Sequence, residues 1–279
     1  MSKFFKLSVI LDMDIQKVIN LYNSGLSLAK VAKDCDSSVA KVHWALKKNK
    51  VELRSLSESH IVKKANYDFF ERIDSEEKAY WLGFLYADAS VTHNSLKLTL
   101  QPRDIGHLEK LKKSLESNHT IFFDREYPRF AISNKKMYQD LVKNGCCERK
   151  TFLITFPTRE ILPESLVRHF VRGYFDGDGS INYSRVLKYN YILWRVEICS
   201  NYTFLNDFKS EFLKFSGVQS NSVLCKEKRR PTEIFYFKLG STTCKNLSLI
   251  YDFFYKDSSI FLDRKKQKFE EITKLINDN

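Results

Sequence analysis

Apolar residues recur three and four positions apart in three short segments between residues 14 and 48. This spacing predicts three successive amphipathic helices, the first ending at Gly25, the second capped by Ser27 and the third by Ser37 or Ser38. A turn at 34–36 precedes the third helix, as is typical of a helix-turn-helix. The residues expected on the inward faces are Ile15, Val18, Ile19 and Tyr22, then Leu28, Val31 and Ala32, then Val39, Val42 and Leu46.

The outward face of the third predicted helix is basic, and the order of residues 24–55 resembles the helix-turn-helix of resolvase-like and phage DNA-binding modules. In that interpretation the helix lies in the major groove and the lysines after it contact phosphates. The alternative is a small helical bundle for protein contacts, with solvated lysines. The candidate DNA contacts are Ser38, Lys41, His43, Trp44, Lys47, Lys48 and Arg54.

The rest of the chain alternates between apolar helical segments and short strand-like segments. A polar, Ser-rich stretch predicts a linker over residues 55–66, which separates a helical domain (1–54) from two further regions, 67–165 and 166–279. Residues 91–101 (VTHNSLKLTLQ) predict a strand, in which Lys97, Thr99 and Gln101 share one face. Residues 235–241 (FYFKLGS) predict another strand of this kind.

Two segments of the chain repeat one pattern, namely an apolar helix with an internal glycine that ends at an acidic residue and leads into a strand. The interval from Gly83 to Gly173 equals that from Asp88 to Asp178. A glycine inside a helix costs about 1 kcal/mol relative to alanine, so a compensating contact is expected. Close approach of two helix backbones at their glycines is such a contact. It would bring Asp88 and Asp178 together at the end of the seam.

Two carboxylates held side by side favour a bound cation, since their mutual repulsion is otherwise uncompensated. Oxygen ligands of this kind suit Mg²⁺. Metal ions between paired carboxylates are a recurrent device for phosphodiester hydrolysis. The repeat therefore predicts a metal-dependent phosphodiesterase.

Charge and composition agree with a nucleic-acid substrate. The chain has 46 Lys and Arg against 34 Asp and Glu, a net charge of +12 that favours a polyanionic partner. The six cysteines form no C-x-x-C pair and no zinc-ligand spacing, which is typical of a reduced, intracellular protein. No apolar run approaches membrane-spanning length. A soluble cytoplasmic protein is expected, and its Lys-, Asn- and Phe-rich composition suggests a bacterial or phage source.

The two repeated segments, WLGFLYADA (81–89) and VRGYFDGDG (171–179), resemble the LAGLIDADG motif of homing endonucleases. The similarity extends over roughly residues 65–275. The first motif departs from the family pattern at Tyr86 and Ala89, whereas the acidic residue that the family uses as metal ligand is present as Asp88. The resemblance implies an α+β fold of two pseudo-symmetric αββαββα units that form a DNA-binding saddle, here preceded by the small all-α helix-turn-helix domain.

What the resemblance implies for chemistry is a Mg²⁺-dependent double-strand break with 3′ overhangs in a long DNA target. Asp88 and Asp178 would bind the metal together with the carbonyls of Ala87 and Gly177. Gln101 and Lys238 are candidate catalytic groups that could orient water or stabilise developing charge. Both halves lie in one chain, so a monomer is expected.

Basic and polar residues on the predicted strands are candidate DNA contacts, because one strand face can pack on the core while the other meets base edges. These residues are Lys97, Thr99, Arg125, Arg129, Arg185, Lys188, Arg195, Lys226, Lys228, Arg229 and Arg230. Three rival interpretations remain open. The first is an intron RNA maturase, and the second is a helix-turn-helix transcription regulator on a LAGLIDADG scaffold without cleavage. The third is a nicking variant, in which the unequal motifs make one half slow.

Overall fold

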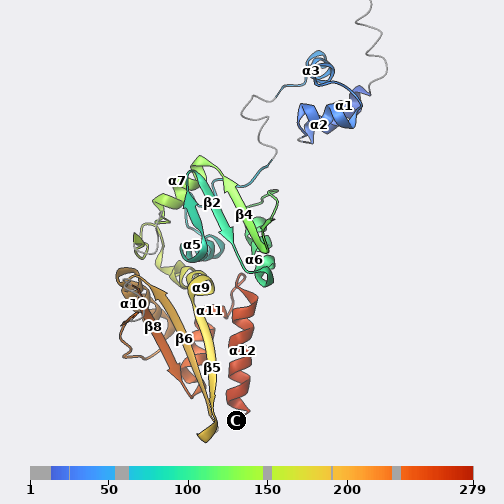
Figure 1. Ribbon diagram of the computed structural model, residues 1–279. Helices are drawn as coiled ribbons and strands as arrows, with labels where there is room; N and C mark the ends of the chain where they lie inside the picture. The colour runs from blue at the N-terminus through green and yellow to red at the C-terminus, as the bar shows by residue number, and fades with distance from the viewer. Residues whose placement is uncertain are drawn as a thin grey trace, which may run out of the picture. The chain divides into compact units, whose positions relative to one another are not determined.

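The computed structural model describes residues 14–24, 26–53, 63–146, 153–189, 191–227 and 234–278 (Figure 1). The chain divides into two compact units, residues 1–64 and 65–279. No helix in these described ranges is both long and apolar enough to span a membrane.

Unit 1 is a bundle of three short helices, α1 (Ile15–Asn23), α2 (Leu28–Asp34) and α3 (Val39–Lys48). Each helix is capped as its sequence dictates. The side chains of Asp14, Ser27 and Ser38 accept hydrogen bonds from the backbone N–H three residues on. The core of the bundle consists of Val18, Tyr22, Val31, Ala32, Val42 and Leu46.

One inward-facing residue of the third helix was predicted wrongly. Val39 is 46% exposed, and Ala45 is buried instead. The physical reason is that Val39 is the first residue of α3, whereas the buried face of the helix is formed further along by Val42, Ala45 and Leu46. Gly25, the predicted end of the first helix, lies outside the described residues.

Unit 2 contains two halves that share an αββαββα arrangement, and the second half has one more helix, α12, after it. This confirms the predicted α+β fold class. The first half comprises α5 (Glu76–Asp88), β1 (Ser90–Thr92), β2 (Ser95–Thr99), the 3₁₀ helix η2 (Pro102–Asp104), α6 (Ile105–Ser114), β3 (Phe122–Asp124), β4 (Tyr127–Ser133) and α7 (Lys135–Lys143). The second comprises η3 (Glu164–Leu166), α9 (Val167–Asp178), β5 (Ser180–Val186), η4 (Leu187–Tyr189), β6 (Tyr191–Ser200), α10 (Tyr202–Ser216), β7 (Cys225–Lys226), β8 (Phe235–Ser241), α11 (Cys244–Tyr255) and α12 (Asp263–Asn277).

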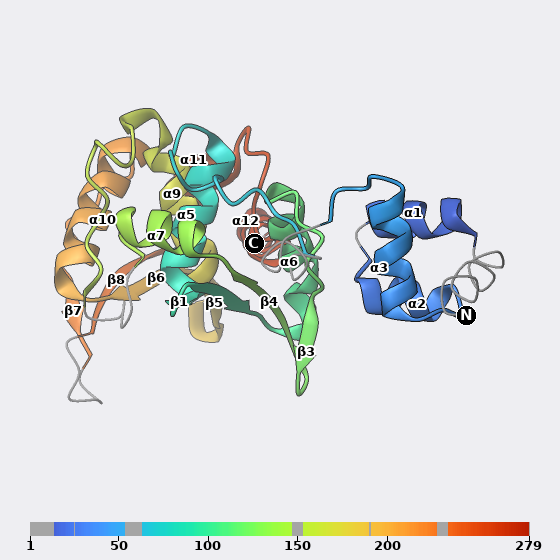
Figure 2. The same cartoon turned by 90° about the horizontal axis from the view of Figure 1, so that it is seen from above.

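Each half has one four-stranded antiparallel sheet, with the orders β1-β2-β4-β3 and β5-β6-β8-β7. Helices cover one face of each sheet (Figure 2). Alternation along β4 follows from this arrangement, since Pro128, Phe130 and Ile132 are buried while Tyr127 and Ser133 are exposed. Both sheets therefore keep one polar face uncovered by helices.

The predicted single strand over residues 91–101 is instead a hairpin of β1 and β2. His93 and Asn94 form its two-residue turn, with φ of 47° and 57°. Two successive positive φ angles are the signature of a type I′ turn, which matches the twist of the flanking strands. The prediction was wrong because histidine is an uncommon residue at the first turn position, so the alternation read as continuous.

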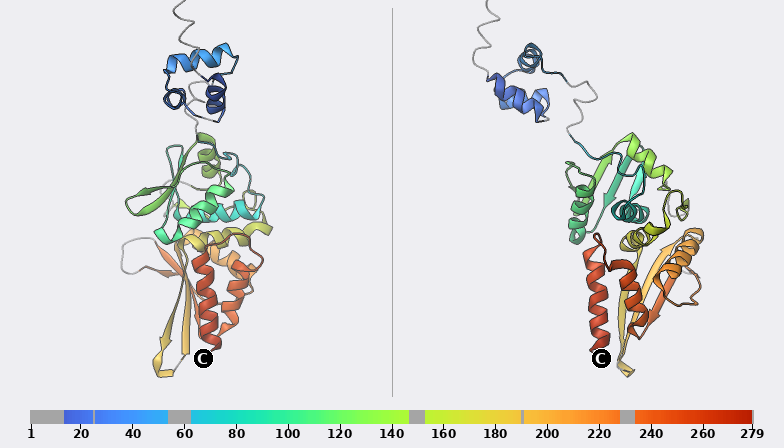
Figure 3. Two further views of the ribbon diagram at one scale, coloured as in Figure 1. Left: turned by 90° about the vertical axis from the view of Figure 1, so that its right-hand side faces the viewer. Right: turned by 180° about the vertical axis from the view of Figure 1, so that it is seen from behind.

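The two halves meet along α5 and α9, which lie side by side between the two sheets (Figure 3). A Cβ atom added at Gly83 would lie 2.1 Å from the Phe170 carbonyl oxygen, and one at Gly173 would lie 2.0 Å from the Tyr80 carbonyl oxygen. No side chain fits at either position. The predicted seam of backbones in contact at these two glycines is thereby confirmed.

Candidate functional site

The C-terminal ends of α5 and α9 place two exposed carboxylates, Asp88 and Asp178, at one end of the seam. The helix ends are in contact there, since a Cβ at Gly177 would lie 2.2 Å from the Ala87 Cβ. Two cavities of about 240 and 220 Å³ flank the ends. Asp88 and Gly177 line the first cavity, and Asp178 and Ala87 line the second. Each cavity therefore contains the carboxylate of one helix and, from the other helix, the residue that directly precedes its carboxylate.

The cavity at Asp88 also contains Gln101, the N-cap residue of η2, so the structure brings this predicted residue to the carboxylate. Asp104 and Arg264 line the same cavity. Nε of Arg264 donates to both Asp104 carboxylate oxygens at 2.9 Å. Arg264 belongs to α12, so the second half contributes a basic group to a cavity of the first half.

The cavity at Asp178 is lined by Tyr174, Cys199 and Ser200 besides the carboxylate. The Tyr174 hydroxyl lies 3.1 Å from Ser200 Oγ and 3.3 Å from the Cys199 carbonyl oxygen. Burial, and then the negative charge of Asp178, raise the pKa of Tyr174 well above its ordinary value. Lys238, the other predicted catalytic residue, is exposed on β8 and pairs with Glu197 at 3.2 Å. It is not among the described residues that line either cavity.

Lys265 is a buried cation that sequence reasoning missed. Its Nζ donates to the carbonyl oxygens of Phe175, Gly177 and Gly179 at the end of α9. Burial lowers the pKa of Lys265 to about 8, and the negative charges of Asp176, Asp88 and Asp178 partly offset that effect. The sequence signal was a run of three basic residues, Arg264, Lys265 and Lys266, at the start of a helix.

A buried polar network anchors the α9 end of the site. Asp176 accepts hydrogen bonds from the Tyr80 hydroxyl (2.8 Å), the Tyr255 hydroxyl (2.9 Å) and the Leu262 backbone N–H (2.7 Å). Burial raises the pKa of the Asp176 carboxyl. These bonds connect α5, α9, the last residue of α11 and the segment that leads into α12. The network therefore fixes the position of the start of α12, which carries Arg264 and Lys265.

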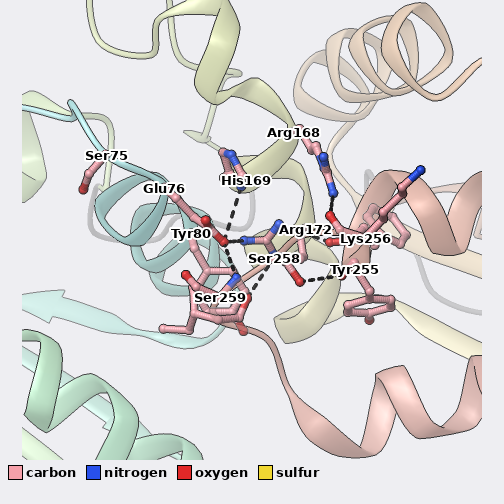
Figure 4. A network of polar contacts seen from close by, with 12 residues as sticks. Ser75, Glu76, Tyr80, Arg168, His169, Arg172, Tyr255, Lys256, Ser258 and Ser259 are labelled. Carbon is pink, nitrogen blue, oxygen red and sulfur yellow. Dashed lines mark hydrogen bonds and ion pairs between the residues drawn. The ribbon is translucent and has the colours of Figure 1, made fainter.

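Arg172 extends this network along the seam (Figure 4). Its guanidinium donates to the carbonyls of Ile260 (3.0 Å) and Phe254 (3.1 Å) and to Glu76 Oε1 (2.7 Å). The same Glu76 oxygen accepts from the Ser259 backbone N–H at 2.9 Å. Each of the three guanidinium nitrogens of this buried cation therefore donates a hydrogen bond, as its burial requires.

The predicted DNA contacts of unit 2 occupy several places. Lys97 and Thr99 are exposed on β2, and Arg195 on β6. Arg129 on β4 bonds Thr99 Oγ1 at 3.0 Å and pairs with Asp124 at 2.6 Å. Arg125 lies in the β3–β4 turn, Lys188 in η4 and Lys226 on β7.

Arg185 is opposite Ile192 in the sheet register, on the face of β5 turned away from that of Asn182 and Ser184. Lys228, Arg229 and Arg230 lie outside the described residues, as does Arg54 of unit 1. On α3, Lys41, His43, Trp44, Lys47 and Lys48 are all exposed. Lys48 Nζ lies 4.7 Å from the centre of the Trp44 ring. Ser38 caps the helix instead of projecting from it.

The oxygen donors at the seam fit a hard divalent cation. The described residues contain no cluster of three or more His, Cys, Asp or Glu side chains, so two carboxylates and nearby carbonyls make up the protein's share. Mg²⁺ is commonly held by one or two carboxylates, with water and substrate phosphates completing its ligands. The Gly177 carbonyl also accepts from Lys265 at 3.2 Å, and its second lone pair remains for a metal.

Comparisons with known proteins give limited matches. No family model matches the chain. A replication factor C small subunit of Methanocaldococcus jannaschii is 32% identical over 123 residues, covering 41% of this chain. The chain spans only 7% of that protein's length.

Among solved structures, the LAGLIDADG meganuclease I-AabMI bound to uncleaved DNA covers 72% of this chain and 91% of its own, with 12% identity and a TM-score of 0.49. The LAGLIDADG homing endonuclease I-LtrWI bound to target DNA covers 77% and 92%, with 14% identity and a TM-score of 0.48.

Proposed function

We propose that the protein is a site-specific, metal-dependent DNA endonuclease of the LAGLIDADG homing type. The observation that carries this proposal is the pair of motif helices, joined backbone to backbone at Gly83 and Gly173, which present Asp88 and Asp178 together at one end of the seam. Two uncovered sheet faces with basic side chains extend on either side. Such a surface suits a long polyanionic duplex.

In this proposal each cavity takes one strand of the duplex. Asp88 and Asp178, with the carbonyls of Ala87 and Gly177, would hold Mg²⁺, which when bound activates water and stabilises the leaving oxygen. Gln101 is placed to orient water at Asp88. Lys265 holds the Gly177 carbonyl and the end of α9 in place and adds a positive charge to the electrostatics of both carboxylates. Cleavage of both strands would give a double-strand break with 3′ overhangs.

Unit 1 is proposed as a second DNA-reading element. Its third helix exposes three lysines, a histidine and a tryptophan on one surface. A separate reading head would lengthen the recognised sequence without entering the chemistry. A monomer suffices in this proposal, because both carboxylates lie in one chain.

The test is cleavage of a plasmid library of randomised or host-derived inserts by the full chain, with Mg²⁺ and with EDTA. We expect discrete double-strand breaks that require Mg²⁺. Asp178→Asn and Asp88→Asn should each reduce cleavage by about a thousandfold or more, because each removes a metal ligand. Asp207→Asn, at an exposed carboxylate on α10, is the matched control and should cut like the wild type.

The exposed basic surface of unit 1 favours one alternative, a transcription regulator that binds DNA without cutting it. Tight, metal-independent binding to a defined duplex, with no cleavage under any divalent cation, would establish that alternative and overturn the nuclease. Selective binding of a structured RNA over duplex DNA would move the protein to the maturase class instead.

A further inference from the structure

The cavity beside Asp88 contains a basic group whose placement is unusual. Arg264 is the one cation among the described residues that line this cavity, together with Asp88, Gln101 and Asp104. Its side chain is 38% exposed, whereas that of its partner Asp104 is only 6% exposed. A buried carboxylate thus fixes one side of the guanidinium while the other side is accessible to solvent.

The hydrogen bonds between this pair use a single nitrogen. Nε of Arg264 donates to both carboxylate oxygens of Asp104 at 2.9 Å. The two Nη groups take no part in this clamp. A guanidinium offers a planar fork of donors that matches a carboxylate or a phosphate, so an Nε-held arginine keeps a fork edge for a second anion.

The backbone that carries Arg264 is also fixed from both sides. Leu262 N–H donates to Asp176 at 2.7 Å, and Lys110 of α6 pairs with Asp263 at 2.8 Å. Lys265 binds the end of α9 through three carbonyls. Arg264 is thus held by neighbours on both halves, which is the rigidity that recognition of a single phosphate requires.

We propose that Arg264 binds the non-bridging oxygens of a phosphodiester in the one DNA strand that enters the Asp88 cavity. Asp104 acts as its positioning residue. This inference rests on the proposed endonuclease function and deepens it, because it assigns a strand and a phosphate to a residue of the last helix.

Charge supports this assignment. Asp88 and Asp104 place two carboxylates in a small cavity, and a phosphodiester brings a third negative charge. A fixed guanidinium beside Asp88 offsets the repulsion at the point where the strand must approach. Without Arg264, the charge of Asp104 would also be buried without its partner.

The first test measures binding without cleavage, in EDTA, to the duplex recovered from the cleavage selection. Single phosphates around each scissile position are replaced one at a time by neutral methylphosphonates. With wild-type protein we expect a loss of affinity of about tenfold to a hundredfold at one position, on one strand only, the size of a charged hydrogen-bonded contact. In Arg264→Gln the same replacement should have no further effect, as a double-mutant cycle requires.

The second test resolves the two strands during cleavage in Mg²⁺. Arg264→Gln should slow the cut of the strand identified by the methylphosphonate by about tenfold or more, and Arg264→Lys should restore part of that rate. Asp104→Asn should give an intermediate loss on the same strand. Arg159→Gln is the matched control, because Arg159 pairs with Glu211 at 2.6 Å and is 40% exposed. It should change neither strand.

Arg264→Gln leaves Asp104 unpaired, so the double variant Asp104→Asn/Arg264→Gln, which removes both charges, checks that the fold is kept. Its thermal midpoint should be close to that of the wild type, while its strand-specific defect persists. Equal methylphosphonate effects in wild type and Arg264→Gln, or an equal slowing of both strands, would overturn the role of Arg264 and leave the endonuclease intact. A wild-type protein that cuts no DNA would overturn both proposals.

Discussion

The two halves of unit 2 share an element order and a sheet order, yet their motif helices are anchored differently. In the second half Asp176, two residues before Asp178, accepts three hydrogen bonds in full burial. At the corresponding position of the first half, Tyr86 donates one hydrogen bond to the Asn144 carbonyl at 2.6 Å. Asp176 thus contacts the segment that follows α11, and Tyr86 contacts the segment that follows α7.

The difference shows that the end of a motif helix can be anchored either by a hydrogen-bond acceptor, Asp176, or by a donor, Tyr86. A carboxylate accepts hydrogen bonds, and Asp176 receives them from the Tyr255 hydroxyl and the Leu262 N–H of its own half and from the Tyr80 hydroxyl of the first half. A phenol needs an acceptor and space, and Gly145, at φ 94°, provides the space because a Cβ there would lie 1.8 Å from the Tyr86 hydroxyl. Tyr86 therefore departs from the family pattern without loss of the anchor. The glycine at the contact of the two helices, by contrast, is the same in both halves, because neither Gly83 nor Gly173 leaves room for a side chain.

The seam gives the largest expected effect. Gly83→Ala and Gly173→Ala should each destabilise unit 2 by at least about 3 kcal/mol, because the new methyl group overlaps a backbone carbonyl that cannot change rotamer. Urea unfolding measures the change. Gly106→Ala, also in a helix, has no atom within 4 Å of the added Cβ and should stabilise slightly. Unequal effects of the two seam variants would contradict the symmetry of the contact.

The next largest effects are expected at the two anchoring residues, Asp176 and Tyr86. Asp176→Asn should cost about 3 kcal/mol, since an amide group turned toward the donors leaves buried hydrogen bonds unmade. Tyr86→Phe should cost about 1 kcal/mol, the contribution of a single hydrogen bond. Chemical denaturation of both variants against wild type tests the comparison. Equal losses would mean that the two anchors contribute alike despite their different chemistry.

A smaller effect is expected on the stability of the protein at acidic pH. His107 Nε2 lies 3.0 Å from the Tyr80 hydroxyl, and burial lowers the pKa of His107 to about 3. Burial likewise lowers the pKa of His169 to about 4. Below the ordinary histidine pKa of about 6.5 the unfolded chain takes up protons that the folded chain does not, so stability falls as the pH drops from that value toward 3.

His107→Phe should therefore flatten the dependence of unfolding free energy on pH between about 3 and 6.5, whatever it does to stability at neutral pH. Denaturation curves at several pH values measure the slope. A slope identical to that of the wild type would show that His107 is not held neutral in the folded protein.

The smallest expected effect is on the open sheet faces. Lys238 lies opposite Glu197 in the second sheet, and Ala131 lies opposite Lys97 at the same register of the first. Lys238→Met should change stability by less than about 0.5 kcal/mol, as for other exposed ion pairs. It should change cleavage less than threefold, because Lys238 lines neither cavity. A large, strand-specific loss of cleavage would instead support Lys238 as a catalytic residue.

Local signals in the sequence were sufficient for the seam and the caps. Gly83 and Gly173 stand at equal places in a repeated pattern, and Ser27 precedes an apolar period. The site is harder to predict because its parts are joined across long stretches of chain. Asp104 meets Arg264, and the Gly177 carbonyl meets Lys265, only after α12 packs against both halves. Nothing in the sequence near a lysine distinguishes a buried amine from a solvated one.

The crossing of α12 to the first half also has a consequence for biosynthesis. The first half is translated before Asp263, Arg264 and Lys265, so its residues leave the ribosome before the basic groups that α12 provides. The carboxylate at Asp88 is thus present on the nascent chain without the arginine beside it. The candidate site is therefore complete only after the ribosome has translated α12.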